Sequence, residues 1–143
     1  MKFEGNLQGF DQLSRVLEDL PVNVEKRILQ TATTSAIREA AKEIRKAAPS
    51  SEDEKQSPAS QKYGKLKRNI KVMRLRRNEK GARSARVHTG RAFWGYFLER
   101  GTRYIPANPW FAPAFERSQE NIIKKLAEKL TEGIYKEVNK LKK

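Results

Sequence analysis

Apolar residues in the first third of the chain recur every three or four positions, which is the spacing of one face of an α-helix. Over about residues 8–20 this stripe consists of Phe10, Leu13, Val16, Leu17 and Leu20. Over about residues 22–48 it consists of Ile28, Leu29, Ala32, Ala36, Ile37, Ala40, Ala41, Ile44, Ala47 and Ala48. We therefore predict a short helix that ends before Pro21 and a long helix that ends at Pro49.

The helical pattern stops at residues 49–62, which contain no large apolar side chain. Two prolines and four serines in this stretch predict a mobile loop. Three consecutive acidic residues, 52–54, lie within it. They lack the alternating ligand spacing of a Ca²⁺-binding loop, so we interpret them as solvated and expect no metal site.

A basic β-hairpin is predicted to follow this loop. Residues 66–77 have the alternation of a strand, in which two pairs of apolar residues point to opposite faces: Ile70 and Val72, then Met73 and Leu75. Residues 78–81 (NEKG) form a good turn, because its glycine is free to adopt a positive φ. Residues 82–88 then make a second, weaker strand.

Aromatic residues dominate the start of the last third of the chain. The four-residue spacing of Phe93 and Phe97 suits a helix, whereas the aromatic content also suits a strand; we favour a short helix over 93–100. A proline-rich aromatic loop is expected over 105–113. The final helix is predicted over about 113–141, bent or frayed near its glycine, with a stripe of Phe115, Ile122, Ile123, Leu126, Leu130, Ile134, Val138 and Leu141.

Length and composition restrict the class of protein. The 143 residues suit one domain spanning 1–143. The absence of cysteine excludes a disulfide scaffold, a thiolate metal site and a cysteine nucleophile, and the single histidine excludes a His-pair metal site. There is no apolar run long enough to span a bilayer and no signal-peptide core at the N-terminus. We therefore expect a soluble protein made in a cytoplasm-like compartment, without a membrane partner.

The net charge of +14 is concentrated in one segment. Residues 62–91 hold 12 of the 31 basic residues and one of the 17 acidic residues. Such a segment can track phosphate groups or face an acidic protein, and the sequence leaves both open. The predicted contact residues are Lys65, Lys67, Arg68, Lys71, Arg74, Arg76, Arg77, Lys80, Arg83 and Arg86.

The candidates for catalysis are weak. Nucleophile-elbow, P-loop and dinucleotide motifs are missing, and His88 has no evident partner, so we interpret it as a histidine at the end of the hairpin. Glu99 precedes the turn residues Gly101 and Thr102, and its carboxylate is expected to accept backbone N–H bonds and hold that turn. We expect no catalytic residue, metal or cofactor.

The aromatic residues of this region are expected to serve either as core or as interface anchors. The residues concerned are Phe93, Trp94, Phe97, Pro109, Trp110 and Phe111. For Trp110 and Phe111, which stand between two prolines, the alternatives are core closure and contact with a partner protein.

Two adjoining segments resemble a signature of the tail-completion, or head–tail joining, proteins of long-tailed phages and prophages. They are residues 93–102 (FWGYFLERGT) and 106–115 (PANPWFAPAF). Upstream, an alanine-rich helix that ends in Ala48-Pro49, an opening at 7–13 (LQGFDQL) and a run at 63–70 (YGKLKRNI) are also similar to that family, although Tyr63 stands where the family usually has threonine. The resemblance covers nearly the whole chain.

This resemblance implies an α+β fold, with long helices packed on a small antiparallel sheet. It implies a non-enzymatic virion protein, assembled in the bacterial host cytoplasm and located at the neck or tail top. Copies would form a ring between connector and tail-terminator or tail-tube proteins. The basic hairpin would face the genomic DNA in the channel or an acidic neighbour, and the loop at 49–62 would gain order on assembly.

Two other functions remain as alternatives. A free-standing, sequence-nonspecific protein that binds double-stranded nucleic acid would bind tightly as a monomer, with a steep dependence on salt. A small hydrolase or nuclease would need a catalytic set that the sequence does not supply, and metal-dependent cleavage of DNA would be its test.

Overall fold

The computed structural model describes residues 7–50, 58–75 and 83–142 of the chain. Its elements are, in chain order, α1 (Leu7–Glu18), α2 (Val22–Ala47), α4 (Pro58–Tyr63), α5 (Leu66–Asn69), β1 (Lys71–Leu75), β2 (Ser84–His88), α6 (Trp94–Arg100), α7 (Phe111–Arg117) and α8 (Gln119–Leu141). The α+β class is confirmed, with long helices packed beside one small antiparallel sheet. Among the described helices, none has the length and apolarity needed to cross a membrane.

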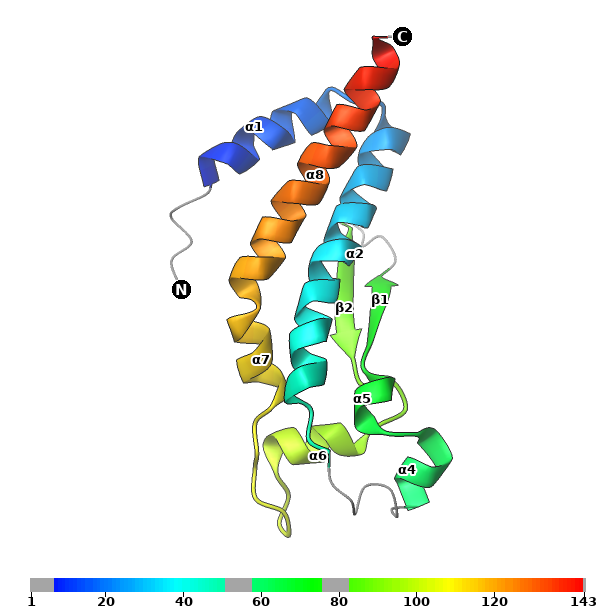
Figure 1. Ribbon diagram of the computed structural model, residues 1–143, viewed down its shortest axis with the longest axis vertical. Coiled ribbons are helices and arrows are strands. Elements are labelled where there is room, and N and C mark those ends of the chain that lie inside the picture. Colours follow the sequence, from blue (N-terminus) through cyan, green and yellow to red (C-terminus); the bar gives the residue numbers. More distant parts are fainter. Residues whose placement is uncertain (1–6, 51–57, 76–82, 143) are drawn as a thin grey trace.

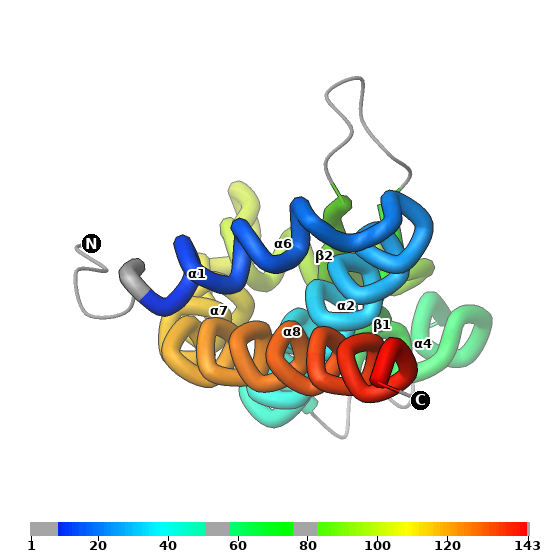
Figure 2. Tube along the Cα trace, turned by 90° about the horizontal axis from the view of Figure 1, so that it is seen from above, coloured from blue at the N-terminus to red at the C-terminus, as the bar shows by residue number. Residues whose placement is uncertain are grey.

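The long helix α2 lies at the centre of the molecule. Figure 1 shows α8 along one side of α2 and the β1–β2 hairpin along the other, while α6 lies across the end of α2. Seen from above, α1 leaves the start of α2 and extends away from it (Figure 2). The prediction of a helix over 22–48 is confirmed to within one residue. Alanines on its apolar face are buried where α2 packs against its neighbours.

The apolar face of α2 supports two separate core clusters. Near the start of α2, the first cluster joins α1, α2 and α8, and its buried members are Leu17, Ile28, Ala32, Leu130 and Ile134. Near the end of α2, the second cluster joins α2, α5, α7 and the loops around them, and its buried members are Ala40, Ile44, Ala48, Leu66, Ile70, Ala92, Trp110 and Ala114. The second cluster holds the aromatic segments together, and it therefore positions the candidate site.

The hairpin pairs β1 with β2 in an antiparallel register. Val72 lies opposite Val87, and Val87 packs against the second core cluster, so this pair faces inward. On the other face Met73 lies opposite Arg86, and both are exposed. The turn predicted at 78–81 lies outside the described residues.

The strand predicted over 66–77 is wrong for its first four residues, which form α5. The side-chain amide of Asn69 donates hydrogen bonds to the carbonyl oxygens of Tyr63 (2.9 Å), Gly64 (3.3 Å) and Lys65 (3.0 Å). These bonds give the backbone an alternative to a sheet ladder. They also turn Leu66 into the core, and the strand begins only at Lys71.

The loop predicted over 49–62 is wrong in its second half, where α4 forms. Pro58 occupies the first position of this helix, where its fixed φ is favourable and its missing N–H has no cost. The acidic residues Glu52, Asp53 and Glu54 lie outside the described residues, as do residues 51–57 generally.

The helix predicted over 113–141 is divided at Ser118 into α7 and α8. The buried hydroxyl of Ser118 donates to the Phe115 carbonyl at 2.7 Å, and this bond accompanies the break. By contrast, α8 continues through Gly133 without interruption. A methyl group on Gly133 would lie 2.9 Å from Ile28 Cγ2, so this glycine allows α8 to approach α2 closely.

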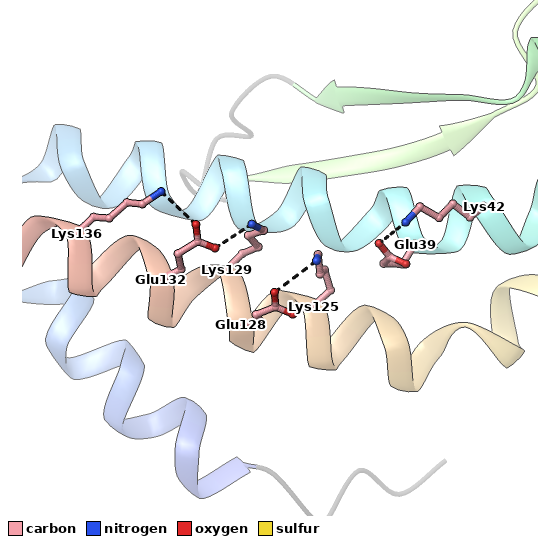
Figure 3. A network of polar contacts seen from close by, with 7 residues as sticks. All are labelled: Glu39, Lys42, Lys125, Glu128, Lys129, Glu132 and Lys136. Atoms are coloured by element: carbon pink, nitrogen blue, oxygen red, sulfur yellow. Dashed lines mark hydrogen bonds and ion pairs between the residues drawn. The ribbon is translucent and has the colours of Figure 1, made fainter.

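Lysine–glutamate pairs follow the exposed faces of α2 and α8 (Figure 3). Glu132 accepts hydrogen bonds from both Lys129 (2.8 Å) and Lys136 (3.1 Å). These bonds lower the pKa of Glu132 to about 2, and the bond from Lys129 has the larger effect. Exposed pairs of this kind contribute little to stability because water and salt screen them. These pairs each lie within one helix, whereas the packing of Gly133 on Ile28 joins α8 to α2.

We predict that Gly133→Ala destabilises the chain by about 1 kcal/mol in urea unfolding, because the clash with Ile28 exceeds the gain in helix propensity. In an Ile28→Ala background the same change should stabilise by up to about 1 kcal/mol, since the clash is removed. Gly9→Ala, on α1 with nothing within 4 Å of the added methyl, serves as the control and should stabilise in either background. Equal effects of Gly133→Ala in both backgrounds would contradict this packing.

Candidate functional site

The carboxylate of Glu99, near the end of α6, binds the start of α7. Oε2 accepts hydrogen bonds from the backbone N–H groups of Trp110 (2.6 Å) and Phe111 (2.8 Å), and Oε1 accepts one from Ala112 (3.0 Å). The first N–H groups of a helix have no partner within the helix, and the helix dipole favours a negative charge beside them. Glu99 therefore caps α7 from another helix. The carboxylate does not bond to the adjacent turn, where the sequence analysis placed it.

Two opposing effects act on the pKa of Glu99. Burial of the carboxyl works to raise the pKa, while the backbone hydrogen bonds from Phe111, Ala112 and Trp110 and the charge of Arg100 lower it. The net result is a pKa below the ordinary value of glutamate, because the bonded donors favour the ionised form. The group is thus held as a charged hydrogen-bond acceptor and is not poised to exchange protons near neutral pH.

The chain turns after α6 through Gly101 and Thr102. Gly101 has a φ of 75°, and its N–H donates to the Phe97 carbonyl at 2.7 Å. A methyl group at this position would lie 2.7 Å from the Ala107 nitrogen, so both the backbone conformation and the space favour glycine. Thr102 Oγ1 accepts from the N–H groups of Tyr104 (3.2 Å) and Ile105 (3.1 Å).

Trp110 is buried at the point where α5, α6 and α7 meet. Its indole N–H donates to the Gly95 carbonyl at 3.2 Å. A methyl group on Gly95 would lie 2.8 Å from Leu66 Cδ1 and 3.3 Å from Trp110 Cζ2, so the three elements pack without room for another atom. Of the two alternatives for Trp110, its position is that of core closure.

The remaining predicted anchors are divided between the interior and the surface. Trp94 and Phe111 are half-buried against the second core cluster. Phe93 and Phe97 are 55% and 43% exposed, and Pro109 is exposed as well. The structure adds three exposed residues that the sequence analysis did not select: Tyr96, Tyr104 and Ile105. Tyr96 belongs to the same aromatic run, but periodicity alone did not show that this face of α6 is left exposed by the described part of the chain.

The predicted cations do not form one ribbon. The exposed cations on the strands themselves are Lys71, Arg74 and Arg86, and Arg83 is half-buried just before β2. A second group lies at α5 and the residue before it: Lys65, Lys67 and Arg68. The prediction that Lys67 and Arg68 lie on a strand is therefore wrong. Three further members lie outside the described residues: Arg76, Arg77 and Lys80.

An open hollow of about 500 Å³ lies between the end of β2, α6 and the start of α7, and both His88 and Glu99 line it. The structure thus brings a second titratable residue to the same surface as Glu99. However, His88 Nδ1 accepts the Gly90 N–H at 3.0 Å, and both oxygens of Glu99 already accept backbone bonds. Within the described ranges, no group of three acidic or histidine side chains could hold a metal ion.

We predict that Glu99→Gln destabilises the chain by about 1–3 kcal/mol in urea unfolding at neutral pH. Glutamine keeps the size of the side chain but loses the charge and places an amide donor against backbone donors. Glu116→Gln, an exposed position on α7, is the control and should change stability by less than about 0.5 kcal/mol.

The same pair gives a pH test. A carboxylate with a lowered folded-state pKa contributes its full stabilisation above the unfolded-state value of about 4.3, and this is lost as the pH falls through the folded-state pKa. The difference between wild type and Glu99→Gln should therefore narrow on acidification. A difference that stays constant with pH would contradict the role of the charge.

The chain matches the family model described as "Bacteriophage HK97-gp10, putative tail-component" over residues 11–101, which is more than half of its length. The match runs from α1 to the turn after α6 and so includes the hairpin and Glu99. No curated protein and no solved structure matches the chain. The resemblance to phage tail components is confirmed by this match. The chain belongs to the HK97-gp10-like family of bacteriophage tail components.

Proposed function

We propose that this phage tail component is a ring-forming adaptor at the head–tail junction or the top of the tail. In this role it joins the connector to tail-terminator or tail-tube proteins, after assembly in the cytoplasm of the bacterial host. The family match over residues 11–101 carries the proposal, because it covers most of the folded body.

The chemistry of the site supports a structural role. A tail component of this kind is typically non-enzymatic, and His88 and Glu99, which both line the hollow, accept hydrogen bonds from the protein's own backbone. Glu99 holds α7 against α6, and His88 accepts a bond from the turn that follows β2. Both groups therefore already serve as hydrogen-bond acceptors within the fold.

Self-association into a ring would use two different faces of the chain. A head-to-tail contact between unlike surfaces closes into a ring when the rotation between neighbours is suitable. Helix α8 and the hairpin lie on opposite sides of α2, so each copy offers distinct surfaces to its two neighbours (Figure 1).

The exposed cations Lys71, Arg74 and Arg86 favour a nonspecific contact with genomic DNA in the channel of such a ring. The same cations are also compatible with the second candidate function, that of a free-standing protein that binds double-stranded DNA. The two functions differ in what the isolated chain does. The free-standing protein would bind DNA tightly as a monomer at physiological salt, whereas the adaptor requires its ring to place many weak contacts around the duplex.

Deletion of this reading frame from the phage should leave DNA-filled heads and free tails in lysates viewed by electron microscopy. The reason is that an adaptor is needed to join two structures that assemble separately. Expression of the wild-type chain in trans should restore joined particles, which controls for effects on neighbouring genes. Intact, infectious virions after deletion would contradict the proposal, and salt-dependent binding of DNA by the purified chain would then favour the alternative.

A further inference from the structure

Four aromatic rings form a continuous chain on the surface of α6 and the end of α4. The ring centroids of Tyr63 and Phe93 lie 6.4 Å apart, those of Phe93 and Phe97 6.2 Å, and those of Phe97 and Tyr96 6.1 Å. Although these rings contact one another, Phe93, Phe97 and Tyr96 are 55%, 43% and 57% exposed. We call these four residues the α6 aromatic surface. A cluster of exposed aromatic residues is typical of a binding surface, because monomeric proteins rarely expose large apolar patches.

The surroundings of the α6 aromatic surface are positively charged. Lys62, Arg91, Arg100 and Arg103 are exposed on the segments that carry it and follow it. Between residues 58 and 115, Glu99 is the only acidic residue that the structure describes, and its carboxylate oxygens accept three backbone N–H bonds. Within the described residues of this segment, Glu99 is therefore the one carboxylate beside several cations, and of these Arg100 acts on it.

The arrangement of the rings favours a protein over a nucleic acid. Bases stack on open aromatic faces. Here Lys62 lies over the Tyr63 ring at 5.2 Å, and Arg100 lies over the Tyr96 ring at 5.2 Å. The rings meet one another edge to face, at interplanar angles of 73–81°. Because neighbouring rings are nearly perpendicular, they offer no parallel platform for successive bases, whereas Phe, Tyr and Arg together are typical of protein interfaces.

The charge also favours a different protein over a second copy of this chain. At a net charge of +14, the average surface of another copy repels this positively charged region. A partner with apolar side chains for the rings and carboxylates for the cations complements both features. Arginine can donate two hydrogen bonds to a carboxylate through its N–H fork while its plane remains stacked on a ring.

We infer that the α6 aromatic surface docks an acidic segment of another protein, one in which apolar side chains are flanked by carboxylates. The inference rests on the proposed adaptor role, since it names the chemistry of the protein that the chain binds. The rings would be the anchors, and Lys62 and Arg100, which lie over two of them, would select for acidic groups.

A binding experiment with the full chain tests this directly, using fluorescein-labelled poly(Glu,Tyr), poly-Glu and an oligo-dT as probes. We expect poly(Glu,Tyr) to bind more tightly than poly-Glu of equal length, because only the former fills the aromatic surface. Tyr96→Ser combined with Phe97→Ser should weaken the binding of poly(Glu,Tyr) by about tenfold or more. Tyr135→Ser, a tyrosine on α8 that is 64% exposed, is the matched control and should have no effect.

Three results would overturn the inference. One is equal binding of the two acidic probes, and another is unchanged binding by the double variant when circular dichroism shows that it is folded. The third is evidence for a different occupant of the surface. This would be either preferential binding of oligo-dT or concentration-dependent self-association in sedimentation, provided that the double variant abolishes it.

Complementation of the deletion separates this inference from the proposed function. If the deletion blocks joining and the double variant fails to restore it while Tyr135→Ser succeeds, both are supported. If the double variant restores joining fully, the docking inference fails and the adaptor role stands. A deletion without effect on virions would remove the adaptor role itself, and the probe-binding result would then decide the docking surface alone.

Discussion

The three hydrogen bonds between the Glu99 carboxylate and the start of α7 connect the two parts of the chain that meet around α2. Helix α6 follows the hairpin, and α7 leads into α8, so these bonds link the hairpin side of α2 to its helical side. Removing the carboxylate from water is costly, but three aligned N–H donors and the helix dipole offset that cost. The bonds also keep Trp110 in its place, since Trp110 is itself one of the donors and lies in the core behind them.

This junction decides which aromatic residues are inside and which are outside. With Trp110 bound to the Gly95 carbonyl and packed beside Leu66, the space next to α2 at this end is filled. The outer side of α6 then has no further element to cover it among the described residues. Phe93, Tyr96 and Phe97 remain on the surface as a consequence of how the interior is packed, and they are available to a partner.

The sequence predicted the elements that have a long or regular pattern. The stripe of alanines gave α2 to within one residue, and the alternation after residue 70 gave the hairpin. It missed α4 and α5, which are too short to show helical periodicity and depend on contacts such as those of the Asn69 side chain. The break at Ser118 is accompanied by one hydroxyl bond, and the apolar stripe continues across it. The close approach at Gly133 depends on the position of Ile28, which is remote in sequence.

For the site, sequence reasoning identified Glu99 as an acceptor of backbone bonds but not the donors, because these lie 11 to 13 residues further along the chain. It predicted that the aromatic residues are core or interface anchors but could not separate Trp110 from Phe93, since burial depends on tertiary packing and both residues stand in aromatic runs. The cations were assigned to one ribbon, whereas the structure separates those on α5 from those on the strands.

Cryo-electron microscopy of purified tails from the source phage tests the adaptor role and the docking surface in one experiment. We expect copies of this chain to form a ring at the head-proximal end of the tail, with the α6 aromatic surface covered by a different protein whose carboxylates face Lys62 and Arg100. Tails that lack the chain would contradict the adaptor role. An oligomeric ring in which the aromatic side chains of α6 face solvent would contradict the docking surface.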